Sequence, residues 1–507
     1  MKYKMLLLAV ITIMIGIVGD LGTQDDNNGK GYDISTKAIP NEEWNKIYSC
    51  NIGGSEYCEA VAESVQQTTD GGYILVGNDL ARMSGGNYYN EAWLRKTDSN
   101  GKLLWTKKFT EIFKQYFVYS FRQTKDGGYI LAGALRTESP KDDDAAIIKT
   151  DSKGNKVWVK TFGGIVTDRD DGARSVQQTK DGGYIFAGYT KSSGAGGSDA
   201  LLIKTDSNGN KLWSKAFGGT DDDSINQVQQ TADGGYILAG KMYIPGKQYD
   251  AWLIKTDGSG NKLWSKTFGG SPTKDYEEAA TSVQQTTDGG YILAGTTWAY
   301  GEVYGDAWTI KTDSKGNRVW SKVFSQGFND DDYLYSVRQT SDGGYIFAGR
   351  SYAEYNSNSG AWLLKTDSKG NKLWSKIFGG DKALSVQQTK DGGYVFVGDR
   401  GSTAWIFKLS GEQGITVVSP NGGENWAKGS IHTIKWTKTG STGSYVKIEL
   451  LKGGVLNKVI SSSTLNDGSY PWTISAIQIY GTDYKVRITS TSNSIYKDVS
   501  NNNFKIY

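Results

Sequence analysis

An all-β fold, with most of the chain in a seven-bladed β-propeller, is predicted by three observations. The turn Asp-Gly-Gly-Tyr occurs seven times, and its copies are about 50 residues apart, close to the length of a propeller blade. The composition, with 66 glycines and 6 prolines in 507 residues, is typical of short strands joined by tight turns. The turns begin at Asp70, Asp126, Asp181, Asp233, Asp288, Asp342 and Asp391.

The N-terminus carries an apolar run from Met5 to Val18 after Met1-Lys2-Tyr3-Lys4. The run is too short to span a bilayer comfortably, but it has the length of a secretory signal core. We therefore expect residues 1–22 to be a signal peptide and 23–41 a linker. An uncleaved membrane anchor is the alternative. The mature chain is expected to be secreted or associated with the cell surface, with no transmembrane segment.

Each repeat divides into four strands, which we name A to D. In one unit these are Ser282–Thr286, Tyr291–Gly295, Ala307–Thr312 and Val319–Phe324. The A–B turn contains two glycines, one of which can adopt the positive φ that a tight hairpin needs. Strand B is apolar almost throughout, which is typical of a strand buried on both faces of its sheet.

The last repeat lacks strand D, and its counterpart stands at the start of the chain. The segment Glu43–Tyr48 resembles Leu373–Phe378, the strand D of the sixth repeat. We therefore expect residues 42–411 to form a ring that the N-terminal strand closes, because closure removes an open sheet edge. With this N-terminal segment included, the sequence has seven strands D, marked by Trp44, Trp105, Trp158, Trp213, Trp264, Trp320 and Trp374.

Cys50 and Cys58 are the only cysteines. In an oxidising compartment they predict one local disulfide, with two free buried thiols as the alternative.

Two resemblances to known families follow from longer segments. The C–D segment Lys149–Trp158, KTDSKGNKVW, resembles the repeats of quinoprotein-like propellers and the Asp-box turn of sialidase-type propellers. This resemblance implies a propeller fold rather than a particular activity. Residues 415–507, beginning ITVVSPNGGENWAKGS, resemble the Kre9/Knh1-type domain of serine/threonine-rich surface proteins. That resemblance implies an immunoglobulin-like β-sandwich over residues 412–507, of a type common on secreted and cell-surface proteins.

Acidic residues are concentrated in the D–A connections. Together with the B–C connections, these are the variable segments of the repeats, and both emerge on the same face of the ring, where binding specificity usually resides. Three interpretations stay open: solvated turn residues, calcium ligands, or a catalytic carboxylate pair of the glycosidase type. The candidate calcium ligands are Asp168, Asp170, Asp221, Asp222, Asp223, Asp330, Asp331 and Asp332.

Aromatic residues accompany these acids in and beside the B–C connections. Aromatic rings beside carboxylates suit sugars, whose C–H faces are apolar and whose hydroxyls need partners; the alternative is that these side chains pack the loops onto the blades. The candidate ligand-binding residues are Tyr88, Tyr89, Tyr189, Tyr243, Tyr249, Trp298, Tyr300, Tyr304, Tyr352 and Tyr355.

Several activities are excluded or disfavoured. His432 is the only histidine and lies in the C-terminal unit, so the ring has no histidine base and no His-ligated metal site. The net charge of +3 gives no basic excess for nucleic acid. No cofactor other than possible calcium is indicated.

A binding protein is therefore favoured over an enzyme. The leading hypothesis is a recognition or adhesion protein that binds a polysaccharide or a cell-surface protein through the variable face. The alternatives are a polysaccharide hydrolase or lyase, a quinone-dependent dehydrogenase, disfavoured by the blade count, and a structural surface-layer component.

Overall fold

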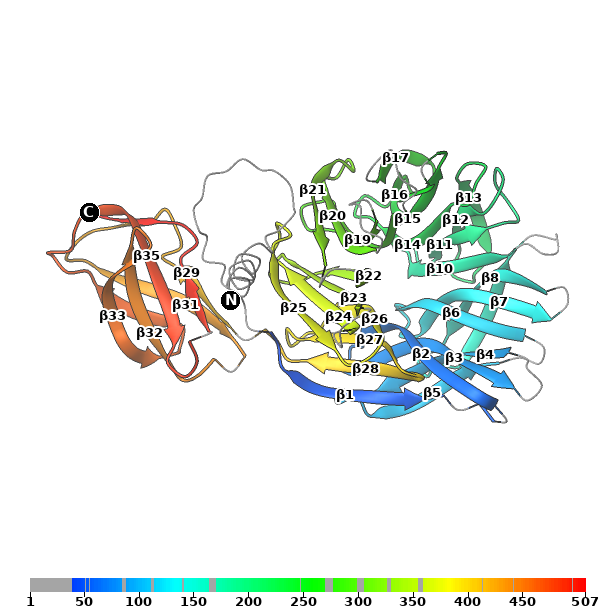
Figure 1. Ribbon diagram of the computed structural model, residues 1–507, viewed down its shortest axis with the longest axis horizontal. Helices are drawn as coiled ribbons and strands as arrows, with labels where there is room; N and C mark the ends of the chain where they lie inside the picture. Colours follow the sequence, from blue (N-terminus) through cyan, green and yellow to red (C-terminus); the bar gives the residue numbers. More distant parts are fainter. Residues whose placement is uncertain are drawn as a thin grey trace, which may run out of the picture. The chain divides into compact units, whose positions relative to one another are not determined.

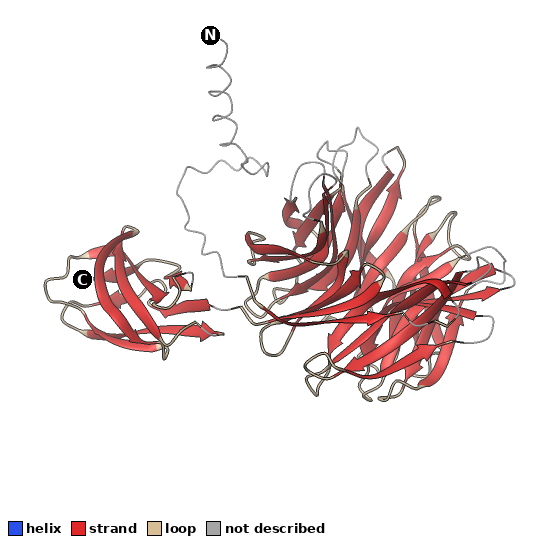
Figure 2. Cartoon of the chain, turned by 60° about the horizontal axis from the view of Figure 1, so that its bottom comes forward, coloured by secondary structure: helices blue, strands red, loops and turns tan. Residues whose placement is uncertain are grey.

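The computed structural model describes residues 39–507 except 51, 54, 84–87, 111–113, 139–140, 164–169, 247, 270–276, 299–304, 326–329, 354–358, 413, 441 and 495. The expected signal peptide, residues 1–22, lies outside this range, as does nearly all of the expected linker. The described residues form strands and loops only (Figure 2). Among them there is no helix with the length and apolar character needed to cross a membrane.

Seven four-stranded antiparallel sheets follow one another along the chain (Figure 1), as the repeats predict. Six of them are formed by consecutive strands. These are β2 (Ser55–Gln67), β3 (Tyr73–Met83), β4 (Tyr88–Thr97) and β5 (Leu103–Phe109); β6 (Lys114–Gln123), β7 (Tyr129–Glu138), β8 (Lys141–Thr150) and β9 (Lys156–Phe162); β10 (Asp171–Gln178), β11 (Tyr184–Thr190), β12 (Asp199–Thr205) and β13 (Lys211–Phe217); β14 (Ser224–Gln230), β15 (Tyr236–Ile244), β16 (Gln248–Thr256) and β17 (Lys262–Phe268); β18 (Ala279–Gln285), β19 (Tyr291–Thr297), β20 (Asp306–Thr312) and β21 (Arg318–Phe324); β22 (Asp330–Gln339), β23 (Tyr345–Ala353), β24 (Gly360–Thr366) and β25 (Lys372–Phe378).

The seventh sheet confirms the predicted closure. It contains β26 (Lys382–Gln388), β27 (Tyr394–Arg400) and β28 (Thr403–Leu409), and its fourth strand is β1 (Glu42–Ser49). β1 pairs antiparallel with β28, with Trp44 opposite Lys408 and Tyr48 opposite Ala404. The first strand of the ring therefore completes the last sheet, and the ring has no open end.

An ion pair between a buried lysine and a largely exposed aspartate explains why the A–B turn repeats so closely. In the fifth sheet the Asp288 carboxylate accepts hydrogen bonds from Thr286 Oγ1 (2.5 Å) and the Gly290 amide (2.9 Å). The buried Lys311 at the end of β20 lies 2.9 Å from the same carboxylate and donates to the Thr312 carbonyl. The equivalent pairs are Lys96–Asp70, Lys149–Asp126, Lys204–Asp181, Lys255–Asp233, Lys365–Asp342 and Lys408–Asp391.

A tryptophan of each strand D packs against the tyrosine that follows the A–B turn of the next sheet. Trp264, for example, lies edge-on to Tyr291 at 6.1 Å, and Trp44 lies in the same way against Tyr73 at 5.6 Å. Such pairs contribute about 0.5–1.5 kcal/mol beyond the area they bury. The others are Trp105–Tyr129, Trp158–Tyr184, Trp213–Tyr236, Trp320–Tyr345 and Trp374–Tyr394.

The C-terminal region is a separate β-sandwich. One sheet has the order β29-β31-β34 and the other β30-β37-β35-β32-β33, with β36 also paired to β35. Trp426, Trp436 and Trp472 lie in its core with aliphatic residues of both sheets. The strands are β29 (Gly414–Ser419), β30 (Asn425–Trp426), β31 (Ile431–Thr439), β32 (Tyr445–Lys452), β33 (Val455–Leu465), β34 (Ser469–Thr473), β35 (Gly481–Ser490), β36 (Lys497–Val499) and β37 (Phe504–Ile506).

Candidate functional site

The A strands are the innermost strands of the ring. Each contacts the A strands of both neighbouring sheets, and Figure 1 shows several of them (β2, β6, β10, β14, β22 and β26) around the centre. The two ends of these strands differ strongly. The end that leads into the A–B turn carries nearly the same residues in every sheet, whereas the other end, toward the variable connections, does not.

The uniform end is joined around the ring by glutamine side chains. Gln284 Oε1, for example, accepts a hydrogen bond of 2.7 Å from the backbone N–H of Gln339 in the next sheet. Gln66, Gln177, Gln229 and Gln387 accept equivalent bonds. We call these five glutamines the glutamine belt. They explain the Gln-Gln-Thr that ends strand A in five of the seven repeats.

The variable end carries a β-bulge at the same place in all seven A strands. The pairing with strand B shifts by one residue there, which leaves one extra residue in each strand A. Bulges change the direction of a side chain and are frequent beside functional sites. We call the seven extra residues the bulge ring: Glu63, Tyr119, Arg174, Asn226, Thr281, Tyr335 and Leu384.

Contacts run from one member of the bulge ring to the next sheet. Arg174 Nη1 donates to Asn226 Oδ1 at 2.5 Å, and Asn226 Nδ2 donates to the Ala280 carbonyl at 2.9 Å. Thr281 Oγ1 donates to the Leu334 carbonyl at 2.6 Å. Side chains of six types, with tyrosine twice, thus occupy the seven bulge positions of the inner strands, toward the variable face.

Burial shifts the acid–base behaviour of three members of this ring. Burial raises the pKa of Glu63 to about 7, against the opposing effects of Lys382 and Asn78. Burial also raises the pKa of Tyr119 and of Tyr335 above that of a free phenol. Perturbed groups of this kind cluster at functional sites more often than elsewhere.

An aromatic run leads from the B–C connection of the fifth sheet to the bulge ring. Trp298 lies edge-on to Tyr333 at 5.9 Å, and Tyr333 is parallel to Tyr335 at 6.3 Å. Beside it, the Arg350 guanidinium lies 4.8 Å from the ring centre of the exposed Tyr352. Of these five residues, the sequence analysis named only Trp298 and Tyr352.

The other described aromatic candidates lie in separate places. Tyr189 packs against the Arg174 guanidinium, 4.9 Å from its ring centre, and so adjoins the bulge ring. Tyr243 and Tyr249 form their own edge-on pair at 5.5 Å, with Lys241 over Tyr249. Tyr89 is partly buried. Tyr300, Tyr304 and Tyr355 lie outside the described residues, and so does the side chain of Tyr88.

Three of the six candidate calcium ligands with described side chains accept hydrogen bonds from loop backbone amides. Asp223 accepts from the amides of Gly219 (2.7 Å) and Tyr243 (2.8 Å). Asp222 accepts from the Ser198 amide (2.7 Å), and Asp331 from the Gly305 amide (3.0 Å). This is the turn chemistry typical of aspartate.

The remaining acids do not form a calcium cage in the part of the chain that is described. Asp170 lies 3.8 Å from Lys191, Asp221 accepts from Thr220, and Asp332 is buried. No group of three acidic, cysteine or histidine side chains comes together there in a way that could hold a metal ion. Asp168 and the side chain of Asp330 lie outside this part.

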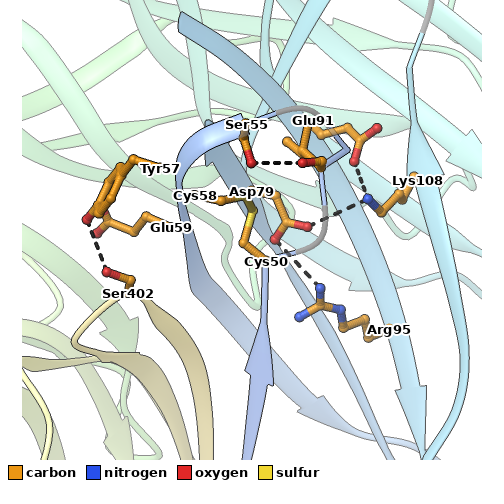
Figure 3. Close-up of a disulfide and its surroundings, with 11 residues drawn as sticks. Cys50, Ser55, Tyr57, Cys58, Glu59, Asp79, Glu91, Arg95, Lys108 and Ser402 are labelled. Carbon is orange, nitrogen blue, oxygen red and sulfur yellow. Dashed lines mark hydrogen bonds and ion pairs between the residues drawn. A yellow bond between two sulfur atoms is a disulfide. The ribbon is translucent and has the colours of Figure 1, made fainter. Parts of the chain in front are cut away.

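The first sheet carries a buried charge cluster beside a disulfide (Figure 3). Asp79 is fully buried, 3.6 Å from Arg95 and 3.8 Å from Lys108, and Lys108 also pairs with Glu91. Burial raises the pKa of Asp79, although both cations oppose this effect. Next to the cluster, a disulfide joins Cys50, after β1, to Cys58 in β2, with Cα atoms 5.7 Å apart. The strand that closes the ring is thereby also linked to the first sheet.

The bulge residues were missed because the sequence of strand A does not show where its pairing with strand B shifts by one residue. One signal was available: the residue before the repeated Ser-Val-Gln-Gln varies among six residue types in the seven repeats, although its neighbours change much less.

Comparison with known proteins gives three findings. No curated protein matches the sequence significantly. Among solved structures, the WD40 β-propeller domain of Doa1 matches with a TM-score of 0.42 and 12% identity, covering 70% of this chain and 96% of that one. The β-propeller domain of the Trilobed protease from Pyrococcus furiosus matches with a TM-score of 0.42 and 12% identity, covering 71% and 95%. Residues 419–506 match the family model of the Kre9/KNH-like N-terminal Ig-like domain, so the C-terminal sandwich is similar to that domain.

Proposed function

We propose that this chain is a recognition protein of the cell surface or exterior that binds carbohydrate at the variable face, around the bulge ring. One observation carries the proposal: the same seven inner strands have a uniform end and a varied end. Uniform residues around a ring serve its closure, whereas the bulge ring holds six residue types at seven equivalent positions, so no single side chain is required there by the repeat itself. Variable groups on a fixed scaffold are typical of a binding site.

The chemistry of these side chains suits a sugar. The run Trp298–Tyr333–Tyr335 offers aromatic faces for the apolar C–H surface of a pyranose ring. Arg174 and Asn226 supply the kinds of donor and acceptor that sugar hydroxyls need. A site with both kinds of group can fix the orientation of a ligand as well as bind it.

The C-terminal sandwich supports the proposed location. The Kre9/KNH family is associated with cell-wall and secreted proteins, and residues 419–506 match its Ig-like domain. We assign this domain an accessory role beside the propeller.

A glycan and polysaccharide binding screen on the purified chain tests the proposal. We expect binding that falls at least tenfold in Tyr335→Ala and in Trp298→Ala, and that is unchanged in Tyr480→Ala, an exposed tyrosine of the sandwich. Thermal unfolding of each variant verifies its fold. Binding to none of the glycans, or equal binding by all three variants, would overturn the carbohydrate assignment and favour a protein partner.

A second candidate, a polysaccharide hydrolase, is favoured by Glu63 alone. A carboxyl group with a pKa of about 7 and a second carboxylate, Asp399, in its electrostatic environment could act as a general acid. Assaying released sugars in the same wells separates the two functions. If the wild type releases sugars and Glu63→Gln abolishes this release, the protein is a hydrolase rather than a binding protein.

A further inference from the structure

The glutamine belt encloses a cavity at the centre of the ring. Its volume is about 200 Å³, and residues of all seven A strands line it. The cavity therefore has room for several waters or for a small ion with part of its hydration shell. The lining side chains include Gln66, Arg122, Gln177, Gln229, Arg338 and Gln387.

Two arginines interrupt the belt. Arg122 of β6 and Arg338 of β22 occupy the position that glutamine holds in the other five sheets. An arginine has no acceptor, so neither can accept the hydrogen bond that the glutamine takes from the next sheet. Each replacement therefore removes a link of the ring and adds a charge to the cavity.

No carboxylate balances these charges among the described residues. Neither arginine has an acidic oxygen within 4.0 Å; each makes one side-chain hydrogen bond, from Nη1 to the carbonyl of the preceding residue, Phe121 or Val337. Burial lowers the pKa of both, and the charge of Arg122 lowers that of Arg338 further, to about 9. Two like charges that share a cavity without a counter-charge are unfavourable unless an anion joins them.

The glutamines that line the cavity offer it donors, because their oxygens are turned toward backbone N–H groups. Each of the five belt glutamines accepts from a backbone N–H of the next sheet, and Gln227 accepts from the Val283 amide and from Ser282. A backbone N–H can only donate, so it is the oxygen of each side-chain amide that faces it. The amide nitrogens make no hydrogen bond in the described structure and remain available to the cavity.

We propose that this cavity is a binding site for a free inorganic oxyanion, phosphate or sulfate, held between Arg122 and Arg338 and by the amide groups of the belt. Guanidinium groups and amide N–H groups are the donors that tetrahedral oxyanions prefer. The site is separate from the carbohydrate site proposed above, because it lies at the opposite, uniform end of the A strands. The bound anion would link the sheets at the two places where the arginines break the belt.

Calorimetric titration of the purified full chain with inorganic phosphate and, separately, sulfate tests this proposal. We expect one anion per chain, and at least a tenfold loss of affinity in the double variant Arg122→Gln/Arg338→Gln. These substitutions restore the belt residue of the other five sheets, so the variant is expected to fold and, without phosphate, to melt at a higher temperature than the wild type. Arg318→Gln, at an exposed position of β21, is the matched control and is expected to bind as the wild type does.

Three results would overturn the proposal. The first is no binding by the wild type at 10 mM of either anion, taken as roughly the weakest affinity of interest. The second is equal binding by the wild type and the double variant. The third is binding of a sulfated disaccharide but of neither free anion, which would assign the arginines to a group carried on a sugar. Loss of glycan binding at the variable face would leave these outcomes unaffected.

Discussion

The side-chain oxygen of Gln387 accepts a hydrogen bond of 2.8 Å from the backbone N–H of Gln67, across 320 positions of the chain. In return, Gln67 Oε1 accepts one of 2.9 Å from the amide of Lys390. The last and first sheets are thus joined on the inner side of the ring, while β1 completes the last sheet on the outer side. The same polar links connect other neighbouring sheets, so the closing interface is built like the rest of the ring.

Replacement of Trp44 by alanine is expected to weaken this closure. Trp44 packs against Tyr73 and against Gly101 of the first sheet, so its loss removes both contacts and leaves a cavity. We expect the free energy of unfolding to fall by about 2–4 kcal/mol in urea denaturation. Leu212→Ala, at a 59% exposed position, is the control and should change it by less than about 0.5 kcal/mol. Equal effects of the two variants would contradict a closing role for Trp44.

The two glycines of the A–B turn are expected to tolerate alanine differently. Gly289 has φ +83° and open space where a Cβ would stand, so Gly289→Ala should cost only about 1–2 kcal/mol of backbone strain. At Gly290 a Cβ would overlap the Thr312 carbonyl oxygen and lie 2.6 Å from Lys311 Nζ. Gly290→Ala should therefore cost more, about 3–4 kcal/mol, because the buried lysine would have to move. Urea denaturation of both variants checks the order, and a larger loss in Gly289→Ala would refute it.

Much of this fold could be predicted from the sequence, because the residues that build it recur. The Asp-Gly-Gly-Tyr turn and the strand D tryptophan occur once per sheet, and the surplus Trp44 segment indicated the closure. The site could be predicted only in part. Asp222 and Asp223 were plausible metal ligands by residue type, but their oxygens accept from loop amides, and sequence does not show where backbone donors lie.

The inner residues were harder to recognise for a different reason. Arg122, Arg338 and the bulge ring interrupt a repeat whose regularity was itself the evidence for the fold. Exceptions such as Tyr335 were therefore treated as part of the strand. Their importance depends on which strand is innermost and on what faces it across the centre, which only the assembled ring shows.

The charge cluster of the first sheet gives a test by double substitution. In the other sheets the position of Arg95 is apolar, as at Ile148, and the position of Asp79 holds residues such as Leu135. Asp79→Leu alone leaves the buried Arg95 without its carboxylate and should cost about 3–5 kcal/mol. Adding Arg95→Ile should recover most of this loss in urea denaturation. A double variant less stable than Asp79→Leu alone would contradict the expectation that Arg95 is unfavourable without its carboxylate.

The raised pKa of Glu63 should make the stability of the chain depend on pH. Its pKa in the folded chain, about 7, lies above the ordinary carboxyl value of 4.5. Between these values the folded state binds more protons than the unfolded state, so the free energy of unfolding should fall as the pH rises from 5 to 7. Allowing for partial exposure, we expect Glu63 to account for about 1–2 kcal/mol of this fall.

Urea denaturation at pH 5, 6 and 7 measures the effect. Glu63→Gln should flatten the profile, whereas Glu56→Gln, an exposed glutamate of the same strand, should leave it unchanged. A profile that is equally steep in Glu63→Gln would show that other groups cause the dependence.

The closing strand has a consequence for synthesis on the ribosome. β1 (Glu42–Ser49) is made first, but its partner β28 (Thr403–Leu409) is the last propeller strand to emerge. At about 5–20 residues per second, β1 waits roughly 20–70 s for that partner. During this time its edge and that of the growing array stay open to other nascent chains. The Cys50–Cys58 disulfide spans only eight positions, so it can form early and hold β1 beside the first sheet until β28 arrives.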